Sequence, residues 1–79
     1  MQSIRSILFL AFPNVGEQDL LIAWELFRAL AWEMNQRDEK LDVVLGSFDA
    51  GPVATQMGTS VQPQRRIGAA DRFDMIYVP

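Results

Sequence analysis

The chain has 79 residues, 49% of them hydrophobic and 22% charged, with a formal net charge of −3. A chain of this length forms one small domain at most, and the scattered basic residues of an acidic chain argue against nucleic-acid binding. The absence of Cys and His excludes a disulfide, a thiol nucleophile, an imidazole base and a zinc site of the usual kind. No apolar run reaches membrane-spanning length and no signal-peptide cleavage site follows the first one, so we expect a cytoplasmic protein.

Five elements are predicted in chain order. They are a strand over 5–12, a helix over 17–35, a strand over 41–48, a small hairpin over 52–63 and a strand over 73–79. The three strands are almost continuously apolar, as is typical of strands covered on both faces. The connection over 64–71 is expected to be irregular or to form one helical turn, with Arg65 and Arg66 in a solvated turn.

The helix over 17–35 has apolar residues at helical spacing on one face. These residues are Leu20, Trp24, Phe27, Ala31 and Met34. We expect Leu26 and Leu30 to widen this face, and the aromatic side chains, Trp32 included, to belong to the core. Asn14 is expected to be the N-cap residue, with Glu17 as its capping-box partner.

The order of the elements predicts an α/β fold with a parallel sheet. We expect the N-terminal part of a flavodoxin-like, doubly wound sheet with the strand order 2-1-3, so that the strand over 73–79 pairs with the strand over 5–12. Ligands of such sheets bind outside the carboxyl ends of the strands, at the switch point between the first and third strands. Because one helix cannot cover both sheet faces, residues 1–79 are expected to be an incomplete single domain and no stable monomer.

Asp19 is the best candidate for a catalytic residue. It lies just inside the predicted helix, a few residues after the first strand, where a carboxyl can orient or protonate a group at the switch point. Glu17 is a weaker candidate for the same role, because its position favours capping. For both residues the alternative is a purely structural interaction with the helix dipole. "NVGEQD" has a single Gly and matches no nucleotide-binding fingerprint, so we expect no cofactor and no metal.

The segment "ILFLAFPNVGEQDLLIAWELFRAL" resembles the opening of the ThiJ/PfpI superfamily, whose fold is the glutamine amidotransferase-like three-layer sandwich. Phe12-Pro13, Asp19-Leu20 and Glu25-Leu26-Phe27 match its isonitrile hydratase branch and the related domains of AraC-type regulators. "SFDAGPVATQMGTSVQP" resembles the family's Gly-Pro-Val flap, and "ADRFDMIYVP" the segment before its Pro-Gly-Gly turn. Asn14 replaces the usual Gly, and Ile22-Ala23 replaces the usual Gly-Pro.

The resemblance implies a cysteine-dependent enzyme on a small molecule, an isonitrile hydratase or a hydrolase, with residues 1–79 as its N-terminal portion. In such enzymes an acid at the position of Asp19 contacts a cysteine on a strand-to-helix elbow. This cysteine and the oxyanion loop would follow Pro79. The alternatives are the ligand-sensing domain of an AraC-type transcriptional regulator and a family member that only dimerises. The resemblance further implies a homodimer with a small-molecule partner, with neither nucleic acid nor membrane bound through this segment.

Overall fold

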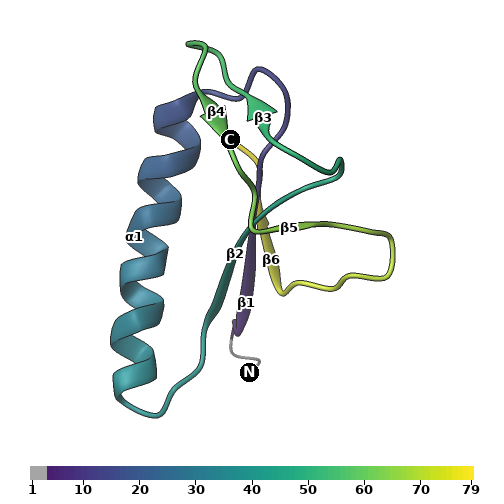
Figure 1. The fold of residues 1–79 in the computed structure, drawn as a ribbon. Helices are drawn as coiled ribbons and strands as arrows, with labels where there is room; N and C mark the ends of the chain where they lie inside the picture. The colour runs from purple at the N-terminus through teal and green to yellow at the C-terminus, as the bar shows by residue number, and fades with distance from the viewer. Residues whose placement is uncertain (1–3) are drawn as a thin grey trace.

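The computed structural model describes residues 4–79. Its elements are β1 (Ser6–Leu10), α1 (Glu17–Gln36), β2 (Asp42–Ser47), β3 (Val53–Ala54), β4 (Ser60–Val61), β5 (Arg65–Arg66) and β6 (Met75–Tyr77). Figure 1 shows α1 on one side of the main sheet, and the hairpin of β3 and β4 at the same end of the molecule as the C-terminus. In this part of the chain, no helix combines the length and the apolar character needed to cross a membrane.

The main sheet has four strands in the order β5-β2-β1-β6, and every neighbouring pair is parallel. Leu8 in the central strand β1 lies opposite Val44 of β2 on one side and Ile76 of β6 on the other. The predicted order 2-1-3 is therefore confirmed for β2, β1 and β6. The protein has a mixed α/β architecture with a parallel sheet, whereas a flavodoxin-like completion of that sheet stays a prediction.

The hydrophobic core lies between α1 and one face of the sheet. Phe9, 1% exposed, is at its centre, with the ring centroids of Phe27 and Tyr77 at 5.6 and 5.1 Å. Burial of a side chain of this size contributes about 1.5–3 kcal/mol. Alternation along β1 turns Leu8 to the opposite face, where it is also buried. The centre of β1, from Ile7 to Phe9, is thus buried on both faces, which explains why its sequence is continuously apolar.

The start of α1 differs from the predicted capping box. Gly16 is the N-cap residue, and no side chain makes a capping hydrogen bond there. Asn14 has left-handed backbone (φ 71°), and its N–H donates to a carbonyl of β3 at 2.9 Å. The adjacent Val15 is buried and forms a β-bridge with Thr55, which holds this loop against the hairpin. The prediction for Asn14 and Glu17 is wrong because tertiary contacts use the groups that a local cap would need.

The inner face of α1 lies on the core as predicted. Its residues are Leu20, Trp24, Phe27, Ala31 and Met34. Leu26, Leu30 and Trp32, however, are 65%, 46% and 62% exposed, so the prediction that they belong to the core is wrong. The helix has only one surface to lie on, and its far side stays in solvent. Ile22, Leu26 and Leu30, at every fourth position, form an exposed apolar row that we call the outer stripe.

The hairpin predicted over 52–63 is confirmed, since β3 and β4 pair antiparallel. Its tip turns at Gly58, whose φ of 91° is a conformation that favours glycine. Thr55 is buried at the base of the tip, and its Oγ1 donates to the carbonyl of Thr59 at 2.7 Å. The tip is therefore a closed turn of defined shape.

The connection over 64–71 contains β5 and not the predicted irregular loop or helical turn. The backbone N–H groups of Gln64 and Ile67 donate to carbonyls of β2, both at 2.7 Å. The side-chain oxygen of Gln64 also accepts the N–H of Leu45 at 2.8 Å. The open edge of β2 and the burial of Ile67 hold the segment extended, while Arg65 and Arg66 stay exposed at the edge of the sheet.

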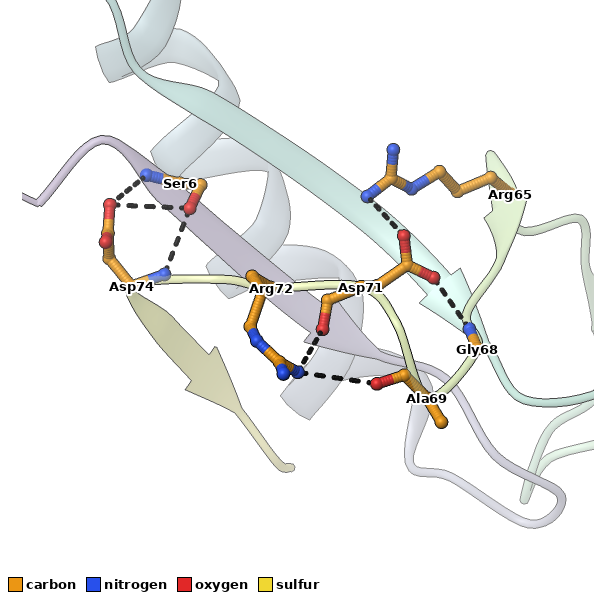
Figure 2. Close-up of polar contacts among 7 residues, drawn as sticks. All are labelled: Ser6, Arg65, Gly68, Ala69, Asp71, Arg72 and Asp74. Carbon is orange, nitrogen blue, oxygen red and sulfur yellow. Dashed lines mark hydrogen bonds and ion pairs between the residues drawn. The ribbon is translucent and has the colours of Figure 1, made fainter.

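Polar contacts shape the loop between β5 and β6 (Figure 2). Asp71 accepts the N–H of Gly68 at 2.7 Å, and its other oxygen pairs with Nη2 of Arg65 at 3.6 Å. The Arg65 guanidinium also lies 5.2 Å from the ring centroid of Phe73, within the range of a cation–π contact. Arg72 donates to two backbone carbonyls of the same loop at 3.4 and 3.5 Å. These contacts join residues of the loop to one another and to Arg65 of β5, and so close the loop on itself.

Asp74 connects the start of β6 to the start of β1 (Figure 2). Its Oδ2 accepts the N–H of Arg5 at 2.7 Å. The same oxygen accepts the N–H of Ser6 at 3.0 Å, and the N–H of Asp74 donates to Ser6 Oγ at 3.0 Å (Figure 2). The bond from the Arg5 N–H is the main reason why the pKa of Asp74 lies below its ordinary value of 3.8. These contacts set the register in which β6 joins the sheet.

The sheet face opposite α1 has no helix on it within residues 4–79. A largely apolar hollow of about 490 Å³ lies on this face. Its lining includes Leu10, Phe48, Ile76 and Val78, which we call the open sheet face; the last three are more than half exposed. The described chain therefore has two layers, one helix and the main sheet, with the two-stranded sheet of β3 and β4 beside them.

Candidate functional site

A polar hollow lies where the start of α1 meets the tip of the hairpin. Its volume is about 480 Å³, and its lining residues are Gly16, Glu17, Gln18, Asp19, Gln56, Met57 and Thr59. Since β1 leads into α1, the hollow lies at the end of the sheet where the parallel strands have their carboxyl ends (Figure 1). Ligand sites of open parallel sheets are found at this end.

Asp19 lies beside the switch point between β1 and β6. The hydroxyl of Tyr77, the last residue of β6, donates to the backbone carbonyl of Asp19 at 3.0 Å and joins the first turn of α1 to this strand end. The Asp19 side chain is exposed at the rim of the hollow. A methyl group on Gly16 would come within 3.0 Å of Asp19 Oδ2, so the missing side chain leaves room for the carboxylate.

Glu17, the second predicted residue, is held by the hairpin. Its Oε1 accepts the N–H of Met57 at 3.0 Å. Partial burial acts to raise the pKa of Glu17, but hydrogen bonds to its carboxylate, first among them the one from the Met57 N–H, outweigh it, and the pKa lies below the ordinary value of 4.5. An ionised carboxylate that already accepts such bonds is a poor proton donor near neutral pH. The geometry favours a structural role for Glu17.

The described residues supply an acid–base group to this hollow but no activated nucleophile. The lining has the carboxylates of Glu17 and Asp19 and no basic side chain. The Thr55 hydroxyl donates to a carbonyl, and no base next to it could activate it. Within residues 4–79, no group of three or more acidic side chains is placed to hold a metal ion. The arrangement can position a polar ligand and exchange a proton with it through Asp19.

The hairpin tip and Tyr77 were not expected at the site. The tip residues Gln56, Met57 and Thr59 reach it only because Val15 holds the loop before α1 against the hairpin. This contact joins segments that are far apart in the sequence, so no pattern in the local sequence predicts it. For Tyr77 a signal was available, since a polar aromatic side chain at the carboxyl end of the third strand falls at the switch point.

Comparisons with protein-family models, with curated proteins and with solved structures find no match to this chain. The fold and the hollow define a class only: an α/β protein with a parallel sheet and a carboxylate at the carboxyl ends of its strands. The resemblance to the ThiJ/PfpI superfamily rests on the sequence motifs and stays a prediction.

Proposed function

We propose that the chain is the N-terminal portion of a ThiJ/PfpI-type enzyme that acts on a small molecule with a cysteine nucleophile. Asp19 is the acid partner of that cysteine, which lies outside residues 1–79 because they contain no Cys. Hydration of an isonitrile is the reaction that the motifs favour, with a hydrolysis as the related possibility. A cytoplasmic location, a homodimer and independence of any cofactor belong to the same proposal.

One observation carries the proposal. The Tyr77 hydroxyl bonds the Asp19 carbonyl at 3.0 Å, so the carboxyl-bearing turn of α1 lies beside the end of β6. β6 and β1 are the two strands between which the switch point of a 2-1-3 sheet falls. A cysteine on a loop above this point would come close to Asp19, and the hollow of about 480 Å³ has space for a small substrate.

The proposed reaction needs a group that moves protons. Addition of one water to an isonitrile, R–NC, gives an N-substituted formamide, R–NH–CHO: the carbon gains one hydrogen and the oxygen, and the nitrogen gains the other hydrogen. Asp19 is the described group that is free to carry such a proton, because the Glu17 carboxylate is held by the hairpin. A positioned acid–base group of this kind accelerates a reaction by about 10²–10⁴-fold.

The test is formamide production from an alkyl isonitrile by the complete gene product that carries this sequence. Asp19→Asn keeps the shape and removes the transferable proton, so we expect kcat to fall by about 10²–10⁴-fold with unchanged far-UV circular dichroism. Asp19→Ala should lose at least as much. Glu39→Gln, the same carboxyl-to-amide change at an exposed position outside the hollow, is the control and should keep its activity.

Full activity of Asp19→Asn would show that Asp19 has only a structural role, as a charge that interacts with the helix dipole. An inactive wild type that binds small molecules and carries a basic helical domain would instead favour the sensing domain of an AraC-type regulator. An inactive wild type without a cysteine at the switch point would overturn the proposal.

A further inference from the structure

The chain by itself exposes more surface than is usual for its mass. Its accessible surface is 5753 Å² at 8.9 kDa, whereas a compact monomer of that mass exposes roughly 4,800 Å². The excess of about 900 Å² is close to the roughly 800 Å² that one partner contributes to a standard interface. The two-layer shape, 38 × 27 × 19 Å, explains the excess.

The open sheet face is one of two apolar surfaces, and its rim has a basic excess, because Asp71, the acidic residue among its lining, pairs with Arg65 at 3.6 Å. Arg72 lines the hollow on this face, and Arg66 Nε donates to the carbonyl of Phe48, another lining residue, at 3.2 Å. Within residues 4–79 both guanidinium groups bond to backbone carbonyls, and neither pairs with a carboxylate. Parallel sheets are normally covered by helices on both faces, so this surface suits an amphipathic helix with acidic residues.

The second apolar surface, the outer stripe of α1, complements the open sheet face in charge. The outer stripe of α1 is accompanied by the exposed Glu25 and Glu33. Glu25 is three residues after Ile22 and Glu33 three residues after Leu30, so both lie next to the stripe on the helix surface. The exposed side of α1 is thus an apolar row with carboxylates beside it, which complements an apolar face with a basic rim.

We propose that the chain binds a second copy of itself head to tail, with the outer stripe of one copy on the open sheet face of the next. The incoming α1 supplies the missing helical layer, and Glu25 and Glu33 lie toward Arg66 and Arg72 of the neighbouring copy. The outer stripe is on the exposed side of α1 and the open sheet face is on the side of the sheet away from α1, so the contact joins unlike surfaces and repeats from copy to copy. This inference concerns residues 1–79 by themselves and does not involve Asp19; in a longer protein that completes the sheet, the added chain would compete with the second copy for the open sheet face.

The test uses sedimentation equilibrium of the 79-residue chain. We expect the average mass of the wild type to rise past twice 8.9 kDa between micromolar and millimolar concentration. Leu26→Glu blocks the outer stripe and Ile76→Glu blocks the open sheet face, so each variant alone should remain monomeric. Mixed together, they should form a 1:1 dimer that grows no further, because each variant keeps the surface that the other has lost.

Arg28→Gln is the matched control. It changes the net charge by the same amount as Leu26→Glu, two residues away and off the stripe, and should associate like the wild type. Should circular dichroism show that either blocking variant is unfolded, Leu30→Glu and Val78→Glu repeat the test at positions that are also exposed. A wild type that stays monomeric, a single variant that still dimerises or a mixture that stays monomeric would each overturn the proposal.

Discussion

Gly46 on β2 occupies a position where no side chain fits. A Cβ there would lie 2.6 Å from Ile67 Cγ1 and 2.9 Å from Leu8 Cδ1. Ile67, just after β5, therefore covers the glycine and meets Leu8 of β1 across the intervening strand. This contact covers part of the sheet face away from α1 and holds β5 at the sheet edge.

Gly46→Ala should lower the free energy of unfolding by about 1–3 kcal/mol, because the added methyl group overpacks a filled site. Gly68→Ala is the control: the nearest atom to its Cβ, Asp71 Oδ2, is 3.8 Å away, and its effect should stay within about 0.5 kcal/mol. Urea unfolding of both variants measures the difference. Equal stability of the two would show that Ile67 does not cover Gly46.

At the scale of elements, β6 is joined to the sheet at both of its ends. Asp74 binds its start to the start of β1, and Tyr77 binds its end to the first turn of α1. A strand of three residues makes few ladder hydrogen bonds, so these two side chains contribute much of what positions it. The same two contacts place the carboxyl end of β6 beside Asp19.

Asp74→Asn should destabilise the chain at neutral pH, and the difference from wild type should shrink in acid. The folded-state pKa of Asp74 is lowered, so its stabilisation is present above the ordinary value of 3.8 and is lost as the pH falls below it. Unfolding curves between neutral pH and pH about 2 measure this. Asp49→Asn removes the same charge from an exposed turn and is the control. A difference that is independent of pH would contradict the assignment.

At the scale of the whole molecule, one helix and one sheet leave apolar surface on both outer sides. The outer stripe and the open sheet face together explain why the exposed area exceeds that of a compact monomer. Small domains have a small free energy of unfolding, so leaving this apolar surface exposed removes a large fraction of it. We therefore expect association and folding to be coupled.

The melting temperature of the wild type should rise with protein concentration, because association stabilises only the folded state. Leu26→Glu should lose this dependence on concentration and show only a broad, weakly cooperative transition at lower temperature, and Arg28→Gln should follow the wild type. Differential scanning calorimetry over a wide concentration range measures both. One cooperative, concentration-independent transition of a wild-type monomer would refute the prediction that residues 1–79 are no stable monomer by themselves.

Local patterns were sufficient to predict β1, α1, β2, the hairpin and β6, because strand and helix periodicity and turn residues are properties of short segments. Their order was also sufficient to predict the parallel sheet and the place of Asp19 at its carboxyl end, since sheet connections follow simple rules. The shortening of the last strand from 73–79 to three residues was beyond this reasoning. Strand ends depend on which neighbours offer partners.

Other features were decided only by the tertiary structure. The bond between Glu17 and Met57 replaces a local cap because the hairpin reaches the helix start, and β5 forms because β2 has a free edge. Leu26 has the same apolar character as the buried Leu20, yet it is exposed. A sequence records how apolar a residue is, whereas its burial requires another surface to cover it, and the described fold has a sheet on only one side of α1.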